Sequence, residues 1–271
     1  MDVLTERSSR VVSLAKLHRA SVRRTEGIFL AEGANAVHAA LSTGRAQSLL
    51  VRDDDADRHR DLLARAADAG LPVYRVTARA ADKLSETTTA PGIFAVAELL
   101  SVGLDDLELT GRDRSGAASF VVVAVEPREP GNAGTLIRCA DAMGAAAVLF
   151  LGDAVDPHNG KCVRASAGSV FHVPIVTEKD VDAALARLRA AGFATLATTM
   201  LGEVALPAAD ALLAGPHAWL FGNEAHGLPG SVVEAADHRV SIPIHGRAES
   251  LNLAAASAIC LYASATAQHG A

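Results

Sequence analysis

Short apolar runs and amphipathic stretches alternate along the first hundred residues. Runs rich in valine, isoleucine, leucine and aromatic residues, bounded by glycine or proline, predict strands at 28–31, 48–51, 73–76 and 93–97. Helical spacing of apolar residues predicts two helices, at 34–41 and 58–69. The pattern therefore predicts a small α/β domain over residues 1–100.

A different pattern begins after residues 101–118, which are polar, charged and interrupted by glycines, as expected of an interdomain linker. The continuous apolar run at 120–125 is typical of a strand buried on both faces of a parallel sheet. Further strands are predicted at 145–151, 172–176, 193–198, 217–221 and 240–244, separated most clearly by helices at 132–143, 181–191 and 251–265. We therefore expect residues 119–271 to form a mostly parallel α/β sheet with helices on both faces.

Composition excludes several classes of protein. Half of the 271 residues are apolar, which rules out disorder over most of the chain. The three cysteines are far apart and form no C-x-x-C pair, so neither a disulfide framework nor a metal site is expected. No apolar block follows the polar first ten residues, and polar side chains interrupt the stretch 250–271, which lacks Asp, Glu, Lys and Arg. We therefore expect a cytoplasmic protein without a membrane span.

Charge is unevenly distributed along the chain, and the net charge of −6 is only weak evidence against nucleic-acid binding. The segment 7–24 contains no acidic residue and six basic ones, Arg7, Arg10, Lys16, Arg19, Arg23 and Arg24. Two interpretations of this segment remain open, a solvated basic helix and an arm that contacts RNA.

Three loops that follow predicted strands carry the candidate chemistry: EPREPGNAG at 126–134, FGNEAHGLP at 221–229 and IPIHGRAESLNL at 242–253. In parallel sheets, ligands bind at the carboxyl ends of the strands. Each loop alone has a structural explanation, with glycines that form turns, Asn132 or Ser250 as a helix cap and Asn252 buried. The chain lacks G-x-G-x-x-G, P-loop and G-x-S-x-G signatures, which disfavours a dehydrogenase, an NTPase and a serine hydrolase.

Together the loops contain three ordered motifs: Asn132-x-Gly134-x-x-x-Arg138; Gly222-x-Glu224-x-x-Gly227-Leu228-Pro229; and Ile242-Pro243-Ile244 followed by Ser250-Leu251-Asn252-Leu253. In this order and spacing they resemble the motifs of the SpoU (TrmH) family of RNA ribose 2′-O-methyltransferases, within the SPOUT class. The resemblance covers roughly residues 120–265. It implies a sheet that ends in a deep trefoil knot, and a pocket for S-adenosylmethionine formed by the knotted loops.

The resemblance also implies which residues form that pocket. Apolar walls would bury the adenine ring while backbone groups bind its edge. The residues implied are Thr198, Thr199, Leu201, Gly202, Gly222, Asn223, Gly227, Ile242, Ile244, Leu251 and Leu253.

For the reaction itself, the family's motif arginine corresponds to Arg138. Because a guanidinium stays protonated in proteins, we expect Arg138 to clamp the adjacent phosphate and to stabilise the developing alkoxide. The resemblance implies that Asn132 orients the ribose, that Glu224 fixes Arg138 or its loop, and that Ser250 and Asn252 position the reacting centre. A purely structural salt bridge between Glu224 and Arg138 is the alternative for that pair.

The amino-terminal domain resembles the substrate-binding domain of this family, an α/β fold similar to ribosomal protein L30. The resemblance depends on FLAEG at 29–33 and on Ser85-x-Thr87 with Pro91-Gly92-Ile93. Family members often have Pro-Gln-Gly where this chain has Ala90-Pro91-Gly92. Family membership would assign Arg19, Arg23 and Arg24 to RNA binding.

The family is usually homodimeric, and the last helix, with Ile259, Leu261 and Tyr262, is a candidate for the interface. The full amino-terminal domain favours ribosomal RNA over transfer RNA as the substrate. Four alternatives remain: a tRNA 2′-O-methyltransferase, a base methyltransferase of the same class, a small-molecule methyltransferase, and a non-catalytic RNA-binding protein on the same fold.

Overall fold

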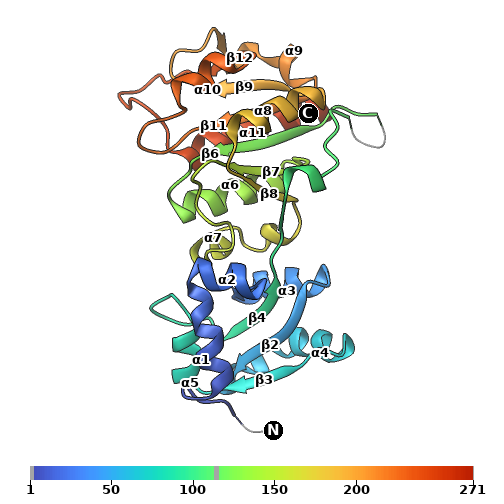
Figure 1. Ribbon diagram of the computed structural model, residues 1–271, viewed down its shortest axis with the longest axis vertical. Coiled ribbons are helices and arrows are strands. Elements are labelled where there is room, and N and C mark those ends of the chain that lie inside the picture. The colour runs from blue at the N-terminus through green and yellow to red at the C-terminus, as the bar shows by residue number, and fades with distance from the viewer. Residues whose placement is uncertain (1–2, 113–115, 271) are drawn as a thin grey trace. The chain divides into compact units, whose positions relative to one another are not determined.

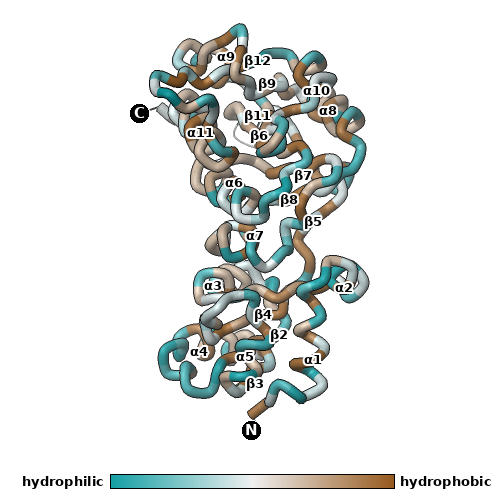
Figure 2. Tube along the Cα trace, turned by 90° about the vertical axis from the view of Figure 1, so that its left-hand side faces the viewer, coloured by the Kyte–Doolittle hydropathy of each residue, from teal (hydrophilic) through white to brown (hydrophobic). Residues whose placement is uncertain are grey.

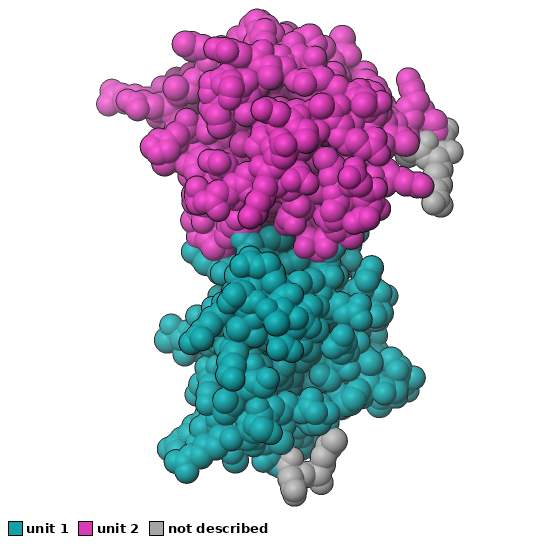
Figure 3. All heavy atoms as spheres, viewed as in Figure 1, with its two compact units in different colours: residues 1–100, 156–172 teal, residues 101–155, 173–271 magenta. Residues whose placement is uncertain are grey.

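The computed structural model describes residues 3–112 and 116–270. The chain forms two compact units, shown in different colours in Figure 3. Unit 1 contains residues 1–100 and 156–172, and unit 2 contains residues 101–155 and 173–271. The first boundary coincides with the predicted end of the amino-terminal domain. Two segments differ from expectation, because 156–172 belongs to unit 1 and the predicted linker belongs to unit 2.

Unit 1 is built on a four-stranded sheet in the order β1-β4-β2-β3 (Figure 1). Strand β4 pairs antiparallel with β1 and β2, and β3 is parallel to β2. Each strand starts within two residues of its predicted start: β1 (Ile28–Glu32), β2 (Ala46–Arg52), β3 (Val73–Val76) and β4 (Ile93–Glu98). The pattern of apolar runs therefore predicted these four strands correctly.

The helices of unit 1 include both predicted ones, α3 (Ala34–Ser42) and α4 (Arg60–Asp68). Three further helices span seven residues each: α1 (Ser9–Ala15), α2 (Ala20–Glu26) and α5 (Ala78–Leu84). Helix α5 was not predicted, whereas a helix was one of the two interpretations left open for the basic segment 7–24. The apolar side chains of these three helices share a core with the sheet, formed by Val11, Leu14, Leu17, Leu50, Val76, Leu84 and Phe94 among others.

The segment 156–172 contains the helix α7 (Gly160–Ala165), which packs on β1. Aromatic rings support this placement, since Phe29 of β1 stacks on Phe171 and lies 4.9 Å from His158, centroid to centroid. A periodicity argument places strands and helices but not long-range partners, so it could not assign this segment to unit 1.

Arg23 is buried in unit 1, with only 3% of its surface exposed. Its guanidinium donates to Oδ2 of Asp156 from Nε at 3.0 Å and from Nη2 at 2.5 Å, and its Nη1 donates to the carbonyl oxygens of Leu17 and His18. The expectation that Arg23 contacts RNA is therefore wrong, because its donors are used inside the domain. Arg19 and Arg24 are exposed.

Asp156 is also bonded by His158, whose Nε2 accepts the backbone N–H of Leu100 at 2.9 Å and whose Nδ1 lies 3.3 Å from Oδ1 of Asp156. Burial by itself would raise the pKa of Asp156, but hydrogen bonds from His158 and Arg23 hold it well below its usual range. A depressed carboxyl pKa adds stability at neutral pH that is lost as the pH falls through the acid range.

Unit 2 is built on an eight-stranded sheet in the order β10-β12-β9-β11-β6-β7-β8-β5, and every pair is parallel. The strands are β5 (Ser101–Val102), β6 (Phe120–Val125), β7 (Val148–Leu151), β8 (Ile175–Glu178), β9 (Ala194–Thr198), β10 (Val204–Ala205), β11 (His217–Phe221) and β12 (His238–Ser241). The central strand β6 is buried at every position, as its continuous apolar run predicted. Figure 2 shows the chain coloured by the hydropathy of each residue.

Helices cover both faces of this sheet. The side chains of Val121, Val123 and Val125 share one core with α8 (Val181–Ala190) and with Val232 of α10 (Gly230–Ala235). On the other face, Trp219 and His217 of β11 contact α11 (Leu253–His269), which packs on α6 (Pro130–Ala142). Both predicted faces are confirmed, and the deep trefoil knot stays a prediction.

The face under α11 contains a buried polar cluster. Ser264 of α11 accepts a hydrogen bond from Nε1 of Trp219 at 2.8 Å and lies 2.7 Å from Nε2 of His217. Burial lowers the pKa of His217 to about 4, although the carbonyl of Gly215 opposes this shift. Among the residues described, no helix is long and apolar enough to cross a membrane.

Substitutions of Arg23 and its neighbour Arg24 test whether the buried Arg23–Asp156 pair stabilises unit 1. We expect Arg23→Met to lower the free energy of unfolding by about 3 kcal/mol, because it leaves the Asp156 carboxylate without its cation. Arg24→Met removes an exposed guanidinium and should change stability by less than about 0.5 kcal/mol. Denaturant titration followed by circular dichroism measures both, and equal effects would contradict the buried pair.

Candidate active site

The predicted loops meet at one edge of the unit 2 sheet. Strands β12, β9, β11 and β6 are consecutive neighbours and all parallel, so their carboxyl ends share an edge. The three motif loops follow β6, β11 and β12, and the TTMLG segment at 198–202 follows β9. The four loops share this edge because their strands are neighbours in the sheet. The sequence pattern does not reveal this strand order.

The first loop turns sharply from β6 into α6. Glu126 has a φ of 51°, a left-handed conformation that is unusual for a residue other than glycine. Helix α6 is capped by Glu129, whose carboxylate accepts the backbone N–H of Asn132 at 2.8 Å, and Pro130 occupies the first turn. Asn132 is therefore not the cap, and its side-chain amide remains free to bind elsewhere.

Glu224 joins the first loop to the second. Its carboxylate accepts the backbone N–H groups of Arg128 at 3.0 Å and Glu129 at 3.2 Å, and the side-chain Nδ2 of Asn132 at 3.2 Å. Partial burial by itself would raise the pKa of Glu224, but these donors hold it below its ordinary value. The ionised carboxylate is thus the form that fixes the loop.

Arg138 is not a partner of Glu224. Its side chain is exposed on α6, and within residues 3–112 and 116–270 no ion pair joins it to Glu224. Of the two roles expected for Glu224, the structure shows the one that fixes the loop. The alternative of a structural Glu224–Arg138 salt bridge is wrong, and Arg138 keeps its donors for another partner.

The second loop is closed by backbone contacts. Asn223 and Gly227 exchange N–H···O hydrogen bonds of 3.0 and 2.8 Å, and Nδ2 of Asn223 donates to the carbonyl of Glu126 at 2.8 Å. A Cβ atom on Gly222 would lie 2.1 Å from backbone atoms of Gly227 and Leu228. Gly222 is therefore required by close packing, which no larger residue satisfies without moving the loop.

A cavity of about 330 Å³ lies between the first and second loops. It is lined by Val125, Glu126, Arg128, Asn223, Ala225, His226, Gly227, Leu228 and Pro229. Sequence reasoning missed Arg128 and His226, although both stand inside the quoted loops. Arg128 pairs with Asp153 at 2.7 Å, and this hydrogen bond raises the pKa of the guanidinium.

The segment after β9 packs tightly against β12. Thr199 donates its backbone N–H to the carbonyl of Val240 at 3.0 Å, and a Cβ on Gly202 would lie 2.6 Å from the carbonyl oxygen of Arg239. Thr198 donates its hydroxyl to the carbonyl of Leu220 at 2.9 Å. The buried Oγ1 of Thr199 has no partner within the residues described.

The third loop leads from β12 to α11. Asn252 is the cap of α11, since its Oδ1 accepts the backbone N–H of Ala255 at 2.8 Å. The structural alternative, with Ser250 as the cap and Asn252 buried, is wrong on both counts, because Ser250 is not the cap and Asn252 is exposed. Ile242 is half-buried and Leu253 is buried, whereas Ile244 and Leu251 are 38% exposed. Leu201, from the segment after β9, is 93% exposed.

Two sequence families match the chain. The SpoU rRNA Methylase family matches residues 119–262, and the MRM3-like substrate binding domain matches residues 8–95. The chain belongs to the SpoU rRNA methylase family. Both resemblances inferred from the motifs are thereby confirmed.

Several relatives of this SpoU methylase span its full length. The 23S rRNA (guanosine(2553)-2′-O)-methyltransferase RlmP of Bacillus subtilis strain 168 is 30% identical and aligns over 96% of this chain and 98% of its own. An AdoMet-bound rRNA methyltransferase from Sinorhizobium meliloti is 29% identical, with a TM-score of 0.83 and 97% of each chain covered. The SpoU methyltransferase AviRb from Streptomyces viridochromogenes, solved with AdoMet, is 28% identical, with a TM-score of 0.83 over 97% of this chain and 100% of its own.

Glu224 of this SpoU methylase gives a test of the loop contacts. In Glu224→Gln the neutral amide should release the backbone N–H groups of Arg128 and Glu129, whose hydrogen exchange should accelerate about tenfold as a charge-assisted bond is lost. Exchange measured residue by residue checks this. Glu234→Gln, a neutralised glutamate on the exposed side of α10, is the control, and equal exchange in both variants would contradict the role of Glu224.

Proposed function

We propose that this protein transfers a methyl group from S-adenosylmethionine to a ribose 2′-hydroxyl of ribosomal RNA. The observation that carries the proposal is the hydrogen-bonded junction at Glu224, which unites the first and second motif loops and leaves the Arg138 guanidinium exposed. The relatives named above support the reaction, since one is a 23S rRNA 2′-O-methyltransferase and two are AdoMet-bound methyltransferases.

The residues at the sheet edge fit this cofactor. Exposed apolar side chains on two loops, Leu201, Ile244 and Leu251, suit an adenine ring, and the buried hydroxyl of Thr199 lacks a partner that a ligand can provide. Gly202 packs against the backbone of β12, and Gly222 packs against the backbone of Gly227 and Leu228. The cofactor would be held by these residues together with Thr198, Asn223, Gly227, Ile242 and Leu253.

When bound, S-adenosylmethionine supplies a methyl carbon activated by the adjacent positive sulfur. Arg138 would bind the phosphate next to the target ribose and stabilise negative charge on the 2′-oxygen, because its guanidinium stays protonated and its donors are exposed. The proton of the hydroxyl would then pass to that phosphate or to water.

The other motif residues would position these groups. Glu224 holds the amide of Asn132, so the orientation of Asn132 toward a ribose would be set before RNA binds. Ser250 is exposed beside the cap of α11 and Asn252 uses its Oδ1 in that cap, which leaves its Nδ2 as a donor for the reacting centre.

Binding of the RNA would use the exposed basic side chains of the first helices. Arg19 and Arg24 remain candidates, together with Arg7, Arg10 and Lys16, all of which are exposed. Arg10 also lies over the ring of Tyr74, 4.1 Å from its centroid, so its direction is partly fixed. These cations would contact phosphates without reading the sequence.

A homodimer is part of the proposal. Helix α11 exposes 41% of Ile259 and 64% of Tyr262, which supports an interface on this face. Leu261 was expected at the interface but is fully buried within unit 2, so the expectation for this residue is wrong.

Substitution at Gly222 tests the cofactor pocket. Gly222→Val should weaken S-adenosylmethionine binding at least tenfold, because the new side chain displaces the loop at Gly227 and Leu228. Calorimetric titration measures the affinity. The control is Gly230→Ala, where a Cβ meets nothing within 4 Å, and unchanged binding to a folded Gly222→Val protein would place the cofactor elsewhere.

Arg138 tests the reaction step. Arg138→Ala should lower kcat for methylation of unmodified 23S rRNA by at least about a hundredfold, because it removes the cation at the developing charge. Affinity for S-adenosylmethionine should stay within about twofold, since no described contact links Arg138 to the proposed pocket. Arg187→Ala, on helix α8, is a control for loss of one guanidinium. A parallel loss of cofactor affinity in Arg138→Ala would contradict the assigned role.

A further inference from the structure

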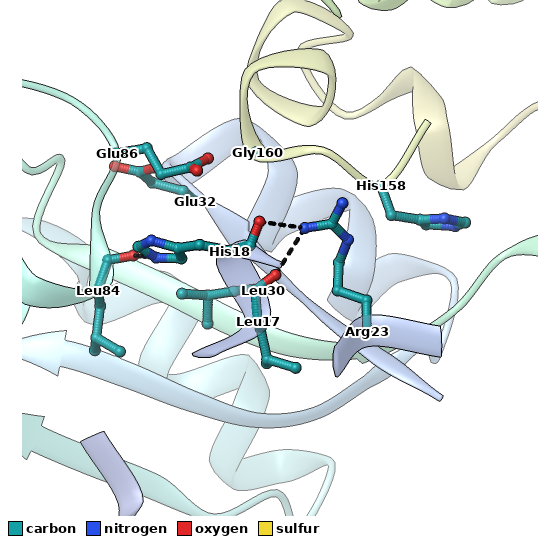
Figure 4. A pocket seen from close by; sticks show the side chains of 9 residues that line it. All are labelled: Leu17, His18, Arg23, Leu30, Glu32, Leu84, Glu86, His158 and Gly160. Carbon is teal, nitrogen blue, oxygen red and sulfur yellow. Dashed lines mark hydrogen bonds between the residues drawn. The ribbon is translucent and has the colours of Figure 1, made fainter. Parts of the chain in front are cut away.

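Glu32 is a buried carboxylate at the carboxyl end of β1 in unit 1. Its side chain is 5% exposed, although ionised side chains are costly to bury without partners. Figure 4 shows its carboxylate beside that of Glu86 and near Gly160. Such a group needs cations or hydrogen-bond donors on both oxygens.

The cation comes from α7. Nη1 of Arg164 donates to Oε2 of Glu32 at 2.7 Å, although the two residues are 132 positions apart in the sequence. Gly160, one turn before Arg164, gives room for this approach, since a Cβ there would lie 3.3 Å from Nη1 of Arg164 and 2.3 Å from Oε2 of Glu86. The segment 156–172 thus provides the cation that pairs with Glu32.

The other oxygen of Glu32 holds the polar segment after α5. The hydroxyl of Ser85 donates to Oε1, and the hydroxyl of Thr87 lies 3.3 Å from the same oxygen and 2.7 Å from the Ser85 oxygen. The Ser85 oxygen in turn accepts the backbone N–H of Thr87 at 3.0 Å, and the Thr87 hydroxyl also lies 2.8 Å from the carbonyl oxygen of Thr89. One carboxylate therefore fixes the backbone over residues 85–89.

This segment, SETTT at 85–89, lies within the region matched by a substrate-binding domain. Its inner side chain, Ser85, is buried, while Glu86, Thr88 and Thr89 are exposed. Exposed hydroxyls and backbone N–H groups are the donors that bind phosphate and ribose oxygens of RNA. No helix or strand includes the segment, so side chains must set its conformation.

We propose that Glu32, Ser85, Thr87 and Arg164 act as positioning residues that hold the 85–89 segment in an RNA-binding conformation. This inference rests on the proposed function in that the RNA is the methylation substrate. In this relay of four residues, Arg164 pairs with Glu32, Glu32 orients the two hydroxyls, and the hydroxyls fix the exposed tip of the segment. Ordering the tip before binding reduces the entropy lost on contact with RNA.

The experiment measures methylation of unmodified 23S rRNA, transcribed in vitro, by the full chain. We expect Thr87→Val, which removes one hydroxyl at nearly constant volume, to raise KM for RNA about fivefold and Glu32→Gln about tenfold. In both variants kcat and the affinity for S-adenosylmethionine should stay within about twofold of wild type. Arg164→Lys keeps the charge and should hold KM within about threefold.

Two controls separate positioning from general stability. Thr43→Val removes a hydroxyl that bonds the carbonyl of Ala39 at the end of α3, outside the relay, and should leave KM unchanged. The double variant Glu32→Gln/Arg164→Met also removes the partly buried cation that Glu32→Gln leaves unpaired, so it should recover the melting temperature that Glu32→Gln loses while its KM stays high.

The outcomes are distinct. The proposal is overturned if Thr87→Val and the double variant bind RNA with the wild-type KM, or if KM follows the melting temperature across all variants. Wild-type protein that binds the RNA but methylates none would count against the proposed function alone, and the same comparison would then use the RNA dissociation constant in place of KM.

Discussion

The carboxylate of Glu224 is the interaction on which the proposed active site depends. It accepts two backbone N–H groups and the amide of Asn132 from the first loop, while its own loop is tied back to Glu126 through Asn223. These bonds form between loops that are far apart in sequence but neighbours in the sheet. They hold in place the start of α6, the helix that carries Arg138.

The parallel sheet explains how much of this the sequence could predict. Continuous apolar runs indicated the strands, so the fold class followed from the pattern. Polar residues directly after the strands indicated the loops at the carboxyl edge, where the active site remains a proposal. The contacts between individual side chains could not be predicted from the pattern or the motifs. Glu224 was expected beside Arg138 or the loop, and only the hydrogen bonds to Arg128 and Glu129 decide for the loop. Asn252 caps α11 in place of Ser250, because either residue type can cap a helix.

In unit 1, too, the sequence pattern predicted the strands but not the long-range partners of individual side chains. A run of six basic residues gave no means to distinguish a buried arginine from exposed ones, yet Arg23 bonds Asp156 while Arg24 is exposed. Arg164 forms the second such pair, with Glu32. The segment 156–172 and the rest of unit 1 thus each supply one arginine and one carboxylate to the other. Partners this far apart in the chain have no local signal, yet the Arg164–Glu32 pair is essential to the proposed support of the RNA-binding segment.

The most direct test of the central claim is the chemical position of the transferred methyl group. Unmodified 23S rRNA would be incubated with the protein and S-adenosylmethionine labelled in its methyl group, and then hydrolysed with alkali. Alkaline cleavage of RNA requires a free 2′-hydroxyl. A 2′-O-methyl group therefore leaves the label in an alkali-resistant dinucleotide, which is the result expected for methylation of a ribose. Label in mononucleotides would indicate base methylation and contradict the proposed ribose methylation. An RNA that binds to the protein but acquires no label would also contradict it.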